Sequence, residues 1–366
     1  MDYRISLSVP TKFSGQSLFW LLTLAVSGFA LLFDGTSGHW TNWGHSLFLP
    51  LALCGLLTAG LGFWVVPGLR ALKAGQIIRE DGPQAHLKKA GTPTMGGIFL
   101  IPVGITIALL WSGFNLEVVA AALMTIAYSF IGWIDDWQIL RQKSNKGISP
   151  KMKLGLQMSF AIAFCLGLAK LQPTLTSIDL PWGLILPLGL LFWPLAIFVL
   201  VAESNATNIT DGVDGLMGGL GAIIFLGLAT TIASHSPELA TFCACLSGSC
   251  LGFVAHNHNP AKVFMGDTGS LGLGGALAAV ALETNTLWIL LILSGILFLE
   301  TLSVMLQVGY YKATKGPDGV GKRLFKMAPF HHHLELSGWP ETQVVGVFYL
   351  INGILALIAY WGIKTW

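Results

Sequence analysis

Eleven long apolar stretches dominate this sequence, and they restrict it to a small number of architectures. A helix needs about 20 consecutive apolar residues to cross the hydrocarbon core of a bilayer, within a range of roughly 17–25. Since lipid offers the backbone no hydrogen bonds, such segments span as helices. We therefore predict an all-α polytopic transmembrane helix bundle of about 10–11 spans. The candidate segments are residues 17–33, 46–66, 96–112, 117–134, 154–170, 182–202, 216–233, 239–255, 271–283, 286–308 and 343–361.

The charge content agrees with a membrane protein and argues against other classes. Only 10% of the 366 residues are charged, whereas a soluble domain carries roughly 25%. The net charge of +2 argues against a nucleic-acid-binding protein with a broad basic face. The five cysteines lie in apolar segments, without the spacing of a metal site or a disulfide framework. We expect them to pack as small apolar side chains.

Basic residues lie almost entirely on one side of the predicted bundle. With the N-terminus inside, all but two of the 20 Lys and Arg fall in loops on that side, the exceptions being Lys170 and Lys364. The positive-inside rule makes this side cytoplasmic. The same loops carry most of the polar side chains, so we expect an active-site cleft at the cytoplasmic face. We divide the chain into an N-terminal extension with an extra apolar segment, 1–45, and a transmembrane domain, 46–366.

Carboxylates are few, and three predicted inner loops each bring some of them to the membrane boundary. Asp135 and Asp136 end the fourth apolar segment, Asp211 and Asp214 precede the seventh, and Asp267 precedes the ninth. Neighbouring carboxylates repel each other, and partial burial makes their ionisation costlier. A divalent cation removes that cost, and Mg²⁺ fits because it combines one or two carboxylates with substrate phosphates. The alternative is that these residues only cap helices or end them in water.

The segment NATNITDGVDGL, residues 205–216, places Asn208, Asp211 and Asp214 three residues apart. On a helical turn these side chains would share one face. Gly212 lets the backbone approach a ligand closely, although it would serve a flexible hinge equally well. In the first predicted inner loop, Lys88 and Lys89 precede a helix start that could hold a phosphate. The alternative for Lys88 is that it binds no phosphate and only follows the positive-inside rule.

The last predicted inner loop contains three consecutive histidines, His331 to His333, followed by Glu335. Adjacent side chains on a helix point about 100° apart, so all three cannot chelate one ion. Hydrogen bonding to phosphate or sugar is the preferred interpretation, because imidazole can donate from either nitrogen. Glu300 lies within an apolar segment, where an ionisable residue is costly. It is either a proton-relay group or a hydrogen-bonded packing residue. Gln307 is better placed for ligand contact.

Five motifs together resemble one family of membrane enzymes, the polyprenyl-phosphate N-acetylhexosamine-1-phosphate transferases. The motifs run in order from about residue 46 to the C-terminus: HLKKAGTPTMGG (86–97), IDDW (134–137), NATNITDGVDGL (205–216), FMGDTGSL (264–271) and MAPFHHHLE (327–335). The first and last resemble the branch whose donor is UDP-N-acetylmuramoyl-pentapeptide. The resemblance implies Mg²⁺-dependent transfer of phospho-N-acetylmuramoyl-pentapeptide to undecaprenyl phosphate in peptidoglycan synthesis. The expected products are lipid I and uridine monophosphate.

The resemblance also implies roles for individual residues. Asp135 and Asp136 match the catalytic aspartate pair, Asp267 matches the principal Mg²⁺ ligand and takes part in catalysis, and His332 falls at a catalytic position. Substrate-binding positions are Lys89, Thr94, Asn208, Asp211, Gly212, Asp214, Asn257, Phe264, Gln307, His331 and His333. The family further suggests a homodimer in the bacterial inner membrane, with the active site facing the cytoplasm.

Two departures from the family pattern concern a lysine and the N-terminus. The family usually has a lysine three residues after the second aspartate of the pair, where this chain has Ile139. Lys143 or Lys146 could supply that charge from further along the chain. The family typically has ten spans beginning outside, so the stretch 17–33 adds one unless it lies in the membrane interface.

The sequence leaves the mechanism open between two routes. The lipid phosphate attacks the donor directly, or two displacements pass through an aspartyl-phosphate. A related transferase with another UDP-N-acetylhexosamine donor is disfavoured by the HHHLE segment. A secondary transporter would show repeated halves, and the sequence shows no such repeat.

Overall fold

The computed structural model describes residues 14–39, 43–72, 89, 91–142 and 147–365. Within them the chain forms thirteen α-helices and one small β-hairpin, β1 (Ser177–Asp179) with β2 (Ile185–Pro187). The helices are α1 (Gly15–Thr36), α2 (Phe48–Ala71), α3 (Gly97–Trp111), α4 (Leu116–Gln142), α5 (Pro150–Leu171), α6 (Phe192–Thr210), α7 (Leu216–Ile232), α8 (Pro237–Asn257), α9 (Gly266–Glu283), α10 (Leu287–Leu293), α11 (Gly295–Ala313), α12 (Phe330–Leu336) and α13 (Glu341–Thr365).

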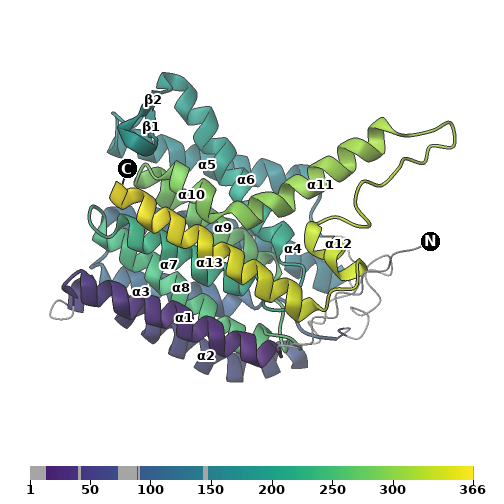
Figure 1. The fold of residues 1–366 in the computed structure, drawn as a ribbon, viewed down its shortest axis with the longest axis horizontal. Coiled ribbons are helices and arrows are strands. Elements are labelled where there is room, and N and C mark those ends of the chain that lie inside the picture. Colours follow the sequence, from purple (N-terminus) through teal and green to yellow (C-terminus); the bar gives the residue numbers. More distant parts are fainter. Residues whose placement is uncertain (1–13, 40–42, 73–88, 90, 143–146, 366) are drawn as a thin grey trace.

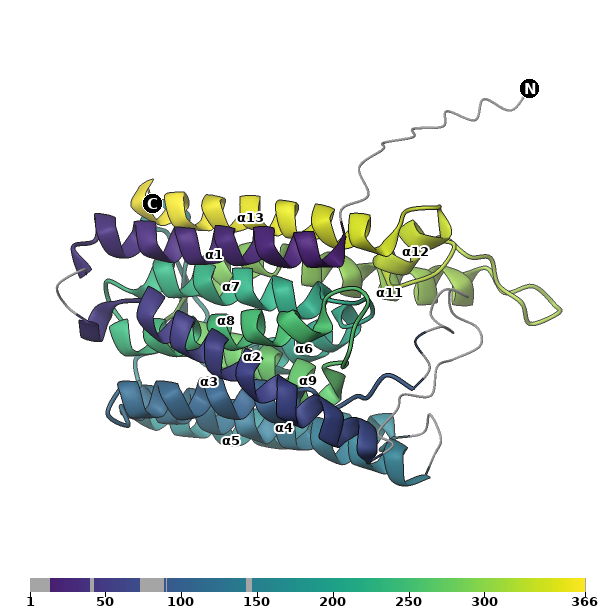
Figure 2. The same cartoon turned by 90° about the horizontal axis from the view of Figure 1, so that it is seen from below.

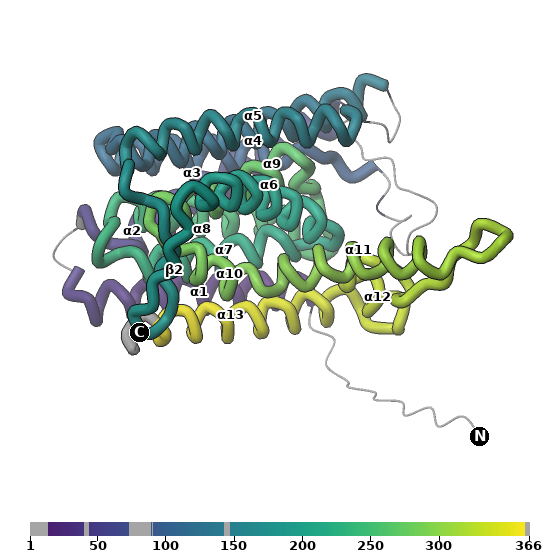
Figure 3. Tube along the Cα trace, turned by 90° about the horizontal axis from the view of Figure 1, so that it is seen from above, coloured from purple at the N-terminus to yellow at the C-terminus, as the bar shows by residue number. Residues whose placement is uncertain are grey.

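Three helices form the centre of the bundle. Almost every residue of α7, α8 and α9 is buried. Helices α1 and α13 lie along one side of this centre and α4 and α5 along the opposite side (Figure 2). Helix α8 packs against α2 and α7, and α9 packs against α4 and α6. Helix α11 leaves the bundle at one end, beside α12 (Figures 1 and 3).

The fold is that of a polytopic helical membrane protein, as predicted. A helix lies over each of the eleven predicted segments. By length and hydropathy, seven helices of the described chain could each cross a membrane, and the bent pair α10–α11 would be an eighth span. Helices α3 and α7 are apolar but shorter. The outer helices expose large apolar side chains, among them Leu24, Trp64 and Leu166, and lipid would cover these.

Two predicted spans differ from the structure, each for a local reason. The helix expected at 182–202 begins only at Phe192, because Pro181 and Pro187 cannot donate backbone hydrogen bonds and residues 177–187 form the hairpin. The segment 286–308 is broken into α10 and α11 by a 75° bend. A Ser294–Gly295 pair lies at the bend, and such pairs are a common site of sharp kinks.

Glycines let α2 and α8 approach each other closely. On α8, Gly248 and Gly252 are four residues apart, the small-xxx-small spacing of tightly packed membrane helices. A Cβ on Gly248 would lie 2.0 Å from the carbonyl oxygen of Leu51, and one on Gly252 would lie 2.3 Å from that of Gly55. No side chain fits at either position without separating the helices.

We expect Gly248→Ala to destabilise the bundle, because the added methyl group forces α2 away from α8. The expected cost is about 1–3 kcal/mol, measured as a fall in the thermal unfolding temperature of the purified protein. Gly60→Ala is the matched control, since a Cβ at Gly60 on α2 meets nothing within 4 Å. Equal melting temperatures for the two variants would contradict this packing.

Candidate active site

Four carboxylates that are distant in sequence meet at one end of the bundle. Asp135 and Asp136 lie near the end of α4, Asp211 directly follows α6, and Asp267 lies in the first turn of α9. Asp267 is close enough to the other three for its charge to act on each of them. The structure thus brings together the carboxylates of all three predicted inner loops.

Asp136 holds the first turn of α9. Its carboxylate accepts hydrogen bonds from the backbone N–H of Asp267 (3.2 Å), the backbone N–H of Thr268 (2.9 Å) and the Thr268 hydroxyl (2.6 Å). A carboxylate at a helix N-terminus satisfies otherwise unpaired N–H groups and favours the helix dipole. Asp136 therefore positions Asp267. A Cβ on Gly132, one turn earlier in α4, would lie 2.0 Å from the Asp267 carbonyl oxygen, so the two helices nearly touch.

Asp135 is buried beside the start of α5. One of its oxygens accepts the backbone N–H of Ile148 (2.9 Å). A Cβ on Gly147 would lie 2.4 Å from the same oxygen, so the carboxylate rests on the backbone there. Glycine at 147 is needed for this close approach.

Lys153 pairs with Asp267, and sequence reasoning missed it. The ammonium lies 2.5 Å from Asp267 Oδ2, while the Asn208 amide donates to Oδ1 (2.8 Å) and to the Ser270 hydroxyl (2.9 Å). The available signal was the Ser149–Pro150 helix start, which places Lys153 in the first turn of α5. Lys143 and Lys146 are the expected replacements for the family lysine that is absent at Ile139. Both lie outside the described residues, as do Lys88 and residues 1–13.

Asp211 ends α6 and faces the other carboxylates. Burial, and then the charges of Asp267, Asp136 and Asp214, raise the pKa of the Asp211 carboxyl well above its usual value, although it accepts the Gly266 backbone N–H. The adjacent Gly212 lies directly against a histidine ring, because a Cβ there would be 2.2 Å from His331 Nε2.

Asp214 belongs to a second polar cluster, made with Lys89, Asn259 and Glu341. Lys89 Nζ contacts Asp214 (2.7 Å) and Glu341 (2.6 Å), and the Asn259 amide donates to the same two carboxylates (3.1 and 3.0 Å). Burial lowers the pKa of Lys89, but the two carboxylates outweigh it and the pKa is raised. Neither Asn259 nor Glu341 stands out in the sequence, because their roles depend on chain segments distant from them.

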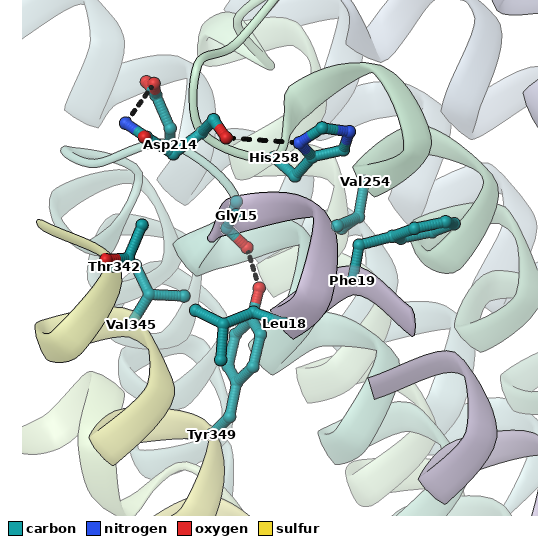
Figure 4. Close-up of a pocket in the computed structure, with 11 residues that line it drawn as sticks. Gly15, Leu18, Phe19, Asp214, Val254, His258, Thr342, Val345 and Tyr349 are labelled. Carbon is teal, nitrogen blue, oxygen red and sulfur yellow. Dashed lines mark hydrogen bonds between the residues drawn. The ribbon is translucent and has the colours of Figure 1, made fainter. Parts of the chain in front are cut away.

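The start of α1 closes this second cluster from below. Figure 4 shows Asp214 and His258 above Gly15, Leu18 and Phe19 of α1. The cavity between them has a volume of about 10 Å³, room for about one water molecule. A Cβ on Gly15 would lie 2.1 Å from the Asn259 carbonyl oxygen, so α1 packs tightly here.

The three histidines have three different environments. Fully buried His331 contacts Glu300 through Nδ1 (3.0 Å), and half-buried His332 contacts Glu335 (2.8 Å). His333 accepts the Lys326 backbone N–H (3.1 Å) and stacks on Phe330. The rings of His331 and His332 contact each other, with centroids 4.2 Å apart.

Four further predicted substrate-binding residues have structural partners. Asn257 donates to the Val263 carbonyl (2.8 Å) and accepts the Gly215 N–H (3.0 Å). Gln307 binds the backbone of residues 324 and 325 through both ends of its amide, and so holds the loop before α12. The backbone of Phe264 pairs with Pro93 and Gly96 beside the α9 start, and Thr94 is buried at the same place. Their predicted ligand contacts remain predictions.

The donor set at Asp267 fits Mg²⁺. Over the residues described, no three His, Cys, Asp or Glu side chains form a ready metal-binding group. Mg²⁺ does not need one, because it commonly takes one or two carboxylates and completes its shell with water and substrate phosphates. Asp136 already accepts three hydrogen bonds, so Asp267, with Asp135 beside it, would supply the oxygen ligands. The Asp267 oxygens are paired with Lys153 and Asn208, and a cation would take the place of the Lys153 charge.

Comparison with known proteins agrees with this geometry. The profile of glycosyl transferase family 4 matches residues 118–285, and signature 1 of the phospho-N-acetylmuramoyl-pentapeptide-transferases matches residues 89–101. The phospho-N-acetylmuramoyl-pentapeptide-transferase of Nostoc punctiforme is 64% identical over 360 residues, 98% of this chain and 99% of the relative. The Rippkaea orientalis protein of the same name is 60% identical over 365 residues, with 98% and 99% covered.

These relationships span nearly the whole chain, including each motif that carries the carboxylates. They decide between a transferase and a secondary transporter in favour of the transferase. The chain belongs to the phospho-N-acetylmuramoyl-pentapeptide-transferases, membrane enzymes of peptidoglycan synthesis.

Proposed function

We propose that the protein transfers phospho-N-acetylmuramoyl-pentapeptide from its UDP-linked donor to undecaprenyl phosphate, with Mg²⁺ as cofactor. The products are lipid I and uridine monophosphate. The observation that carries this proposal is the meeting of Asp135, Asp211 and Asp267 at one end of an apolar bundle. One substrate is a soluble polyanion, and the other is a phosphate held at headgroup level by its hydrocarbon chain. The two can meet only at a membrane boundary.

The distribution of basic residues supports a cytoplasmic location for this boundary in the bacterial inner membrane. Lys89, Lys153 and Lys262 all lie at the end of the bundle that carries the aspartates. UDP-linked donors are soluble, so the donor can reach a site at the cytoplasmic face. The homodimer suggested by the family is part of the same proposal.

Asp267 would hold the metal, which supplies charge neutralisation to the diphosphate as the leaving uridine phosphate forms. Asp135 orients the attacking lipid phosphate. That phosphate is already anionic near neutral pH, so positioning contributes more than proton removal. Asp136 keeps Asp267 in place through the first turn of α9, and Lys153 offsets the repulsion among the carboxylates.

The remaining predicted residues would bind the donor around this centre. Asn208 donates a hydrogen bond to Asp267. Asp211 and Gly212 follow it in the chain, and Gly212 lies against His331. We assign His332 the catalytic position implied by the family. The substrate-binding residues are Lys89, Thr94, Asn208, Asp211, Gly212, Asp214, Asn257, Phe264, Gln307, His331 and His333.

Asp267→Asn should lower turnover at least about 100-fold, because the amide removes the metal-binding charge. Release of uridine monophosphate from UDP-N-acetylmuramoyl-pentapeptide, with undecaprenyl phosphate and with or without Mg²⁺, measures this. Asp318→Asn is the control, because Asp318 is an exposed carboxylate that accepts the Val320 N–H. Near wild-type turnover by Asp267→Asn would sink the metal assignment.

Lys153→Gln should lower kcat roughly 10- to 100-fold, since it removes the charge that holds Asp267. Lys151→Gln is the matched control, because Lys151 is an exposed lysine in the same helical turn. The two variants are compared in steady-state kinetics with saturating substrates. If both keep the wild-type kcat, Lys153 has no part in the reaction.

A single displacement predicts inversion at the β-phosphorus of the donor. The buried position of Asp135, against Gly147 and the Ile148 N–H, favours orientation of the acceptor over a covalent aspartyl-phosphate. A donor made chiral at that phosphorus with sulfur, followed by analysis of the product, gives the stereochemistry. Retention of configuration, or a phosphorylated enzyme trapped with the nucleotide donor alone, would show two displacements.

A further inference from the structure

A fully buried carboxylate, Glu300 on α11, is not used by the reaction as proposed above. Its side chain and that of His331, at the start of α12, are both 0% exposed. An ionisable group inside a membrane bundle is costly, so its retention calls for a partner or a task. Glu300 contacts His331, whose ring lies against Gly212 of the candidate site.

Two hydrogen bonds join Glu300 to this histidine. The backbone N–H of His331 donates to Oε1 (3.1 Å), and the ring Nδ1 lies 3.0 Å from Oε2. This contact engages Nδ1, so Nε2 is the ring nitrogen left for another partner. Holding one ring nitrogen in this way fixes the orientation of the ring and the role of the other nitrogen.

The other nitrogen, Nε2, faces the turn that follows α6. It is buried, with no hydrogen-bond partner among the residues described, and a Cβ on Gly212 would lie 2.2 Å from it. A buried polar atom without a partner costs free energy. Glycine at 212 lets the backbone of this turn lie directly against Nε2.

The setting of Nε2 indicates the chemistry of the missing partner. Glu300 engages the other ring nitrogen, so Nε2 is oriented toward Gly212, next to Asp211. An N–H at this position finds its strongest acceptor in an anionic oxygen. Both substrates of the proposed reaction carry phosphate oxygens.

We propose that Glu300 is a positioning residue, which holds His331 so that Nε2 donates to a substrate phosphate oxygen beside Gly212. The phosphate belongs either to the nucleotide donor or to the polyprenyl phosphate. This inference rests on the proposed function, because it assigns a contact within the same site.

Glu300→Gln tests the proposal. The amide keeps the size of the side chain but removes the charge of the carboxylate, which weakens its hold on the ring through Nδ1. We expect kcat/KM for one substrate to fall roughly 10- to 100-fold with little change in melting temperature. The substrate whose KM rises identifies the source of the phosphate. Glu283→Gln, another buried carboxylate at the opposite end of α9, is the matched control.

The double variant Glu300→Gln with His331→Asn separates positioning from stability. If Glu300 acts through the ring, the double variant is no slower than His331→Asn alone. Losses that multiply in the double variant, or unchanged kinetics in Glu300→Gln, would overturn the proposal.

A second variant covers the case in which Glu300→Gln does not fold. Gly212→Ala places a methyl group against Nε2 without touching Glu300, and it should raise the KM of the same substrate. A normal KM for both substrates in that variant would also overturn the proposal. Failure of the proposed function would look different, since the unmodified enzyme would then release no uridine monophosphate.

Discussion

Repulsion among carboxylates is the constraint on which the rest of this structure depends. Asp135, Asp136, Asp211 and Asp267 come from three separated parts of the chain, and Asp267 lies close enough to repel each of the other three. The fold holds them together through specific bonds, with the N–H groups of α9 on Asp136 and an ammonium on Asp267. Glycines at 132 and 147 allow backbone to approach where any side chain would separate the groups. A site built in this way is suited to a cation and phosphates.

The helical fold and the positions of the main carboxylates could be predicted, because both depend on local sequence. Apolar length alone placed a helix over each predicted segment, and the five motifs marked the family. The break between α10 and α11 was missed since a Ser–Gly pair within a continuous apolar run gives only a weak local signal. The hairpin at 177–187 was missed because its prolines lie inside an otherwise apolar stretch.

The partners of the site residues could not be read from the sequence. Lys153 is one of several lysines near a helix start, and only the packing of α5 beside α6 brings it to Asp267. Glu341 begins α13, more than a hundred residues from Asp214, yet it shares Lys89 with it. Glu300 was open between proton relay and hydrogen-bonded packing, and nothing in the sequence indicated its contact with His331. Contacts between distant segments decide all three.

The most direct measurement is the position of a divalent cation in the crystallised enzyme. Mn²⁺ replaces Mg²⁺ at oxygen sites of this kind, and its anomalous scattering locates it without reference to any assumed ligand. The account predicts one peak at coordination distance, about 2.1 Å, from a carboxylate oxygen of Asp267, on the side facing Asp135. A peak bound elsewhere, with Asp267 still paired only to Lys153 and Asn208 in an enzyme that turns over, would contradict it.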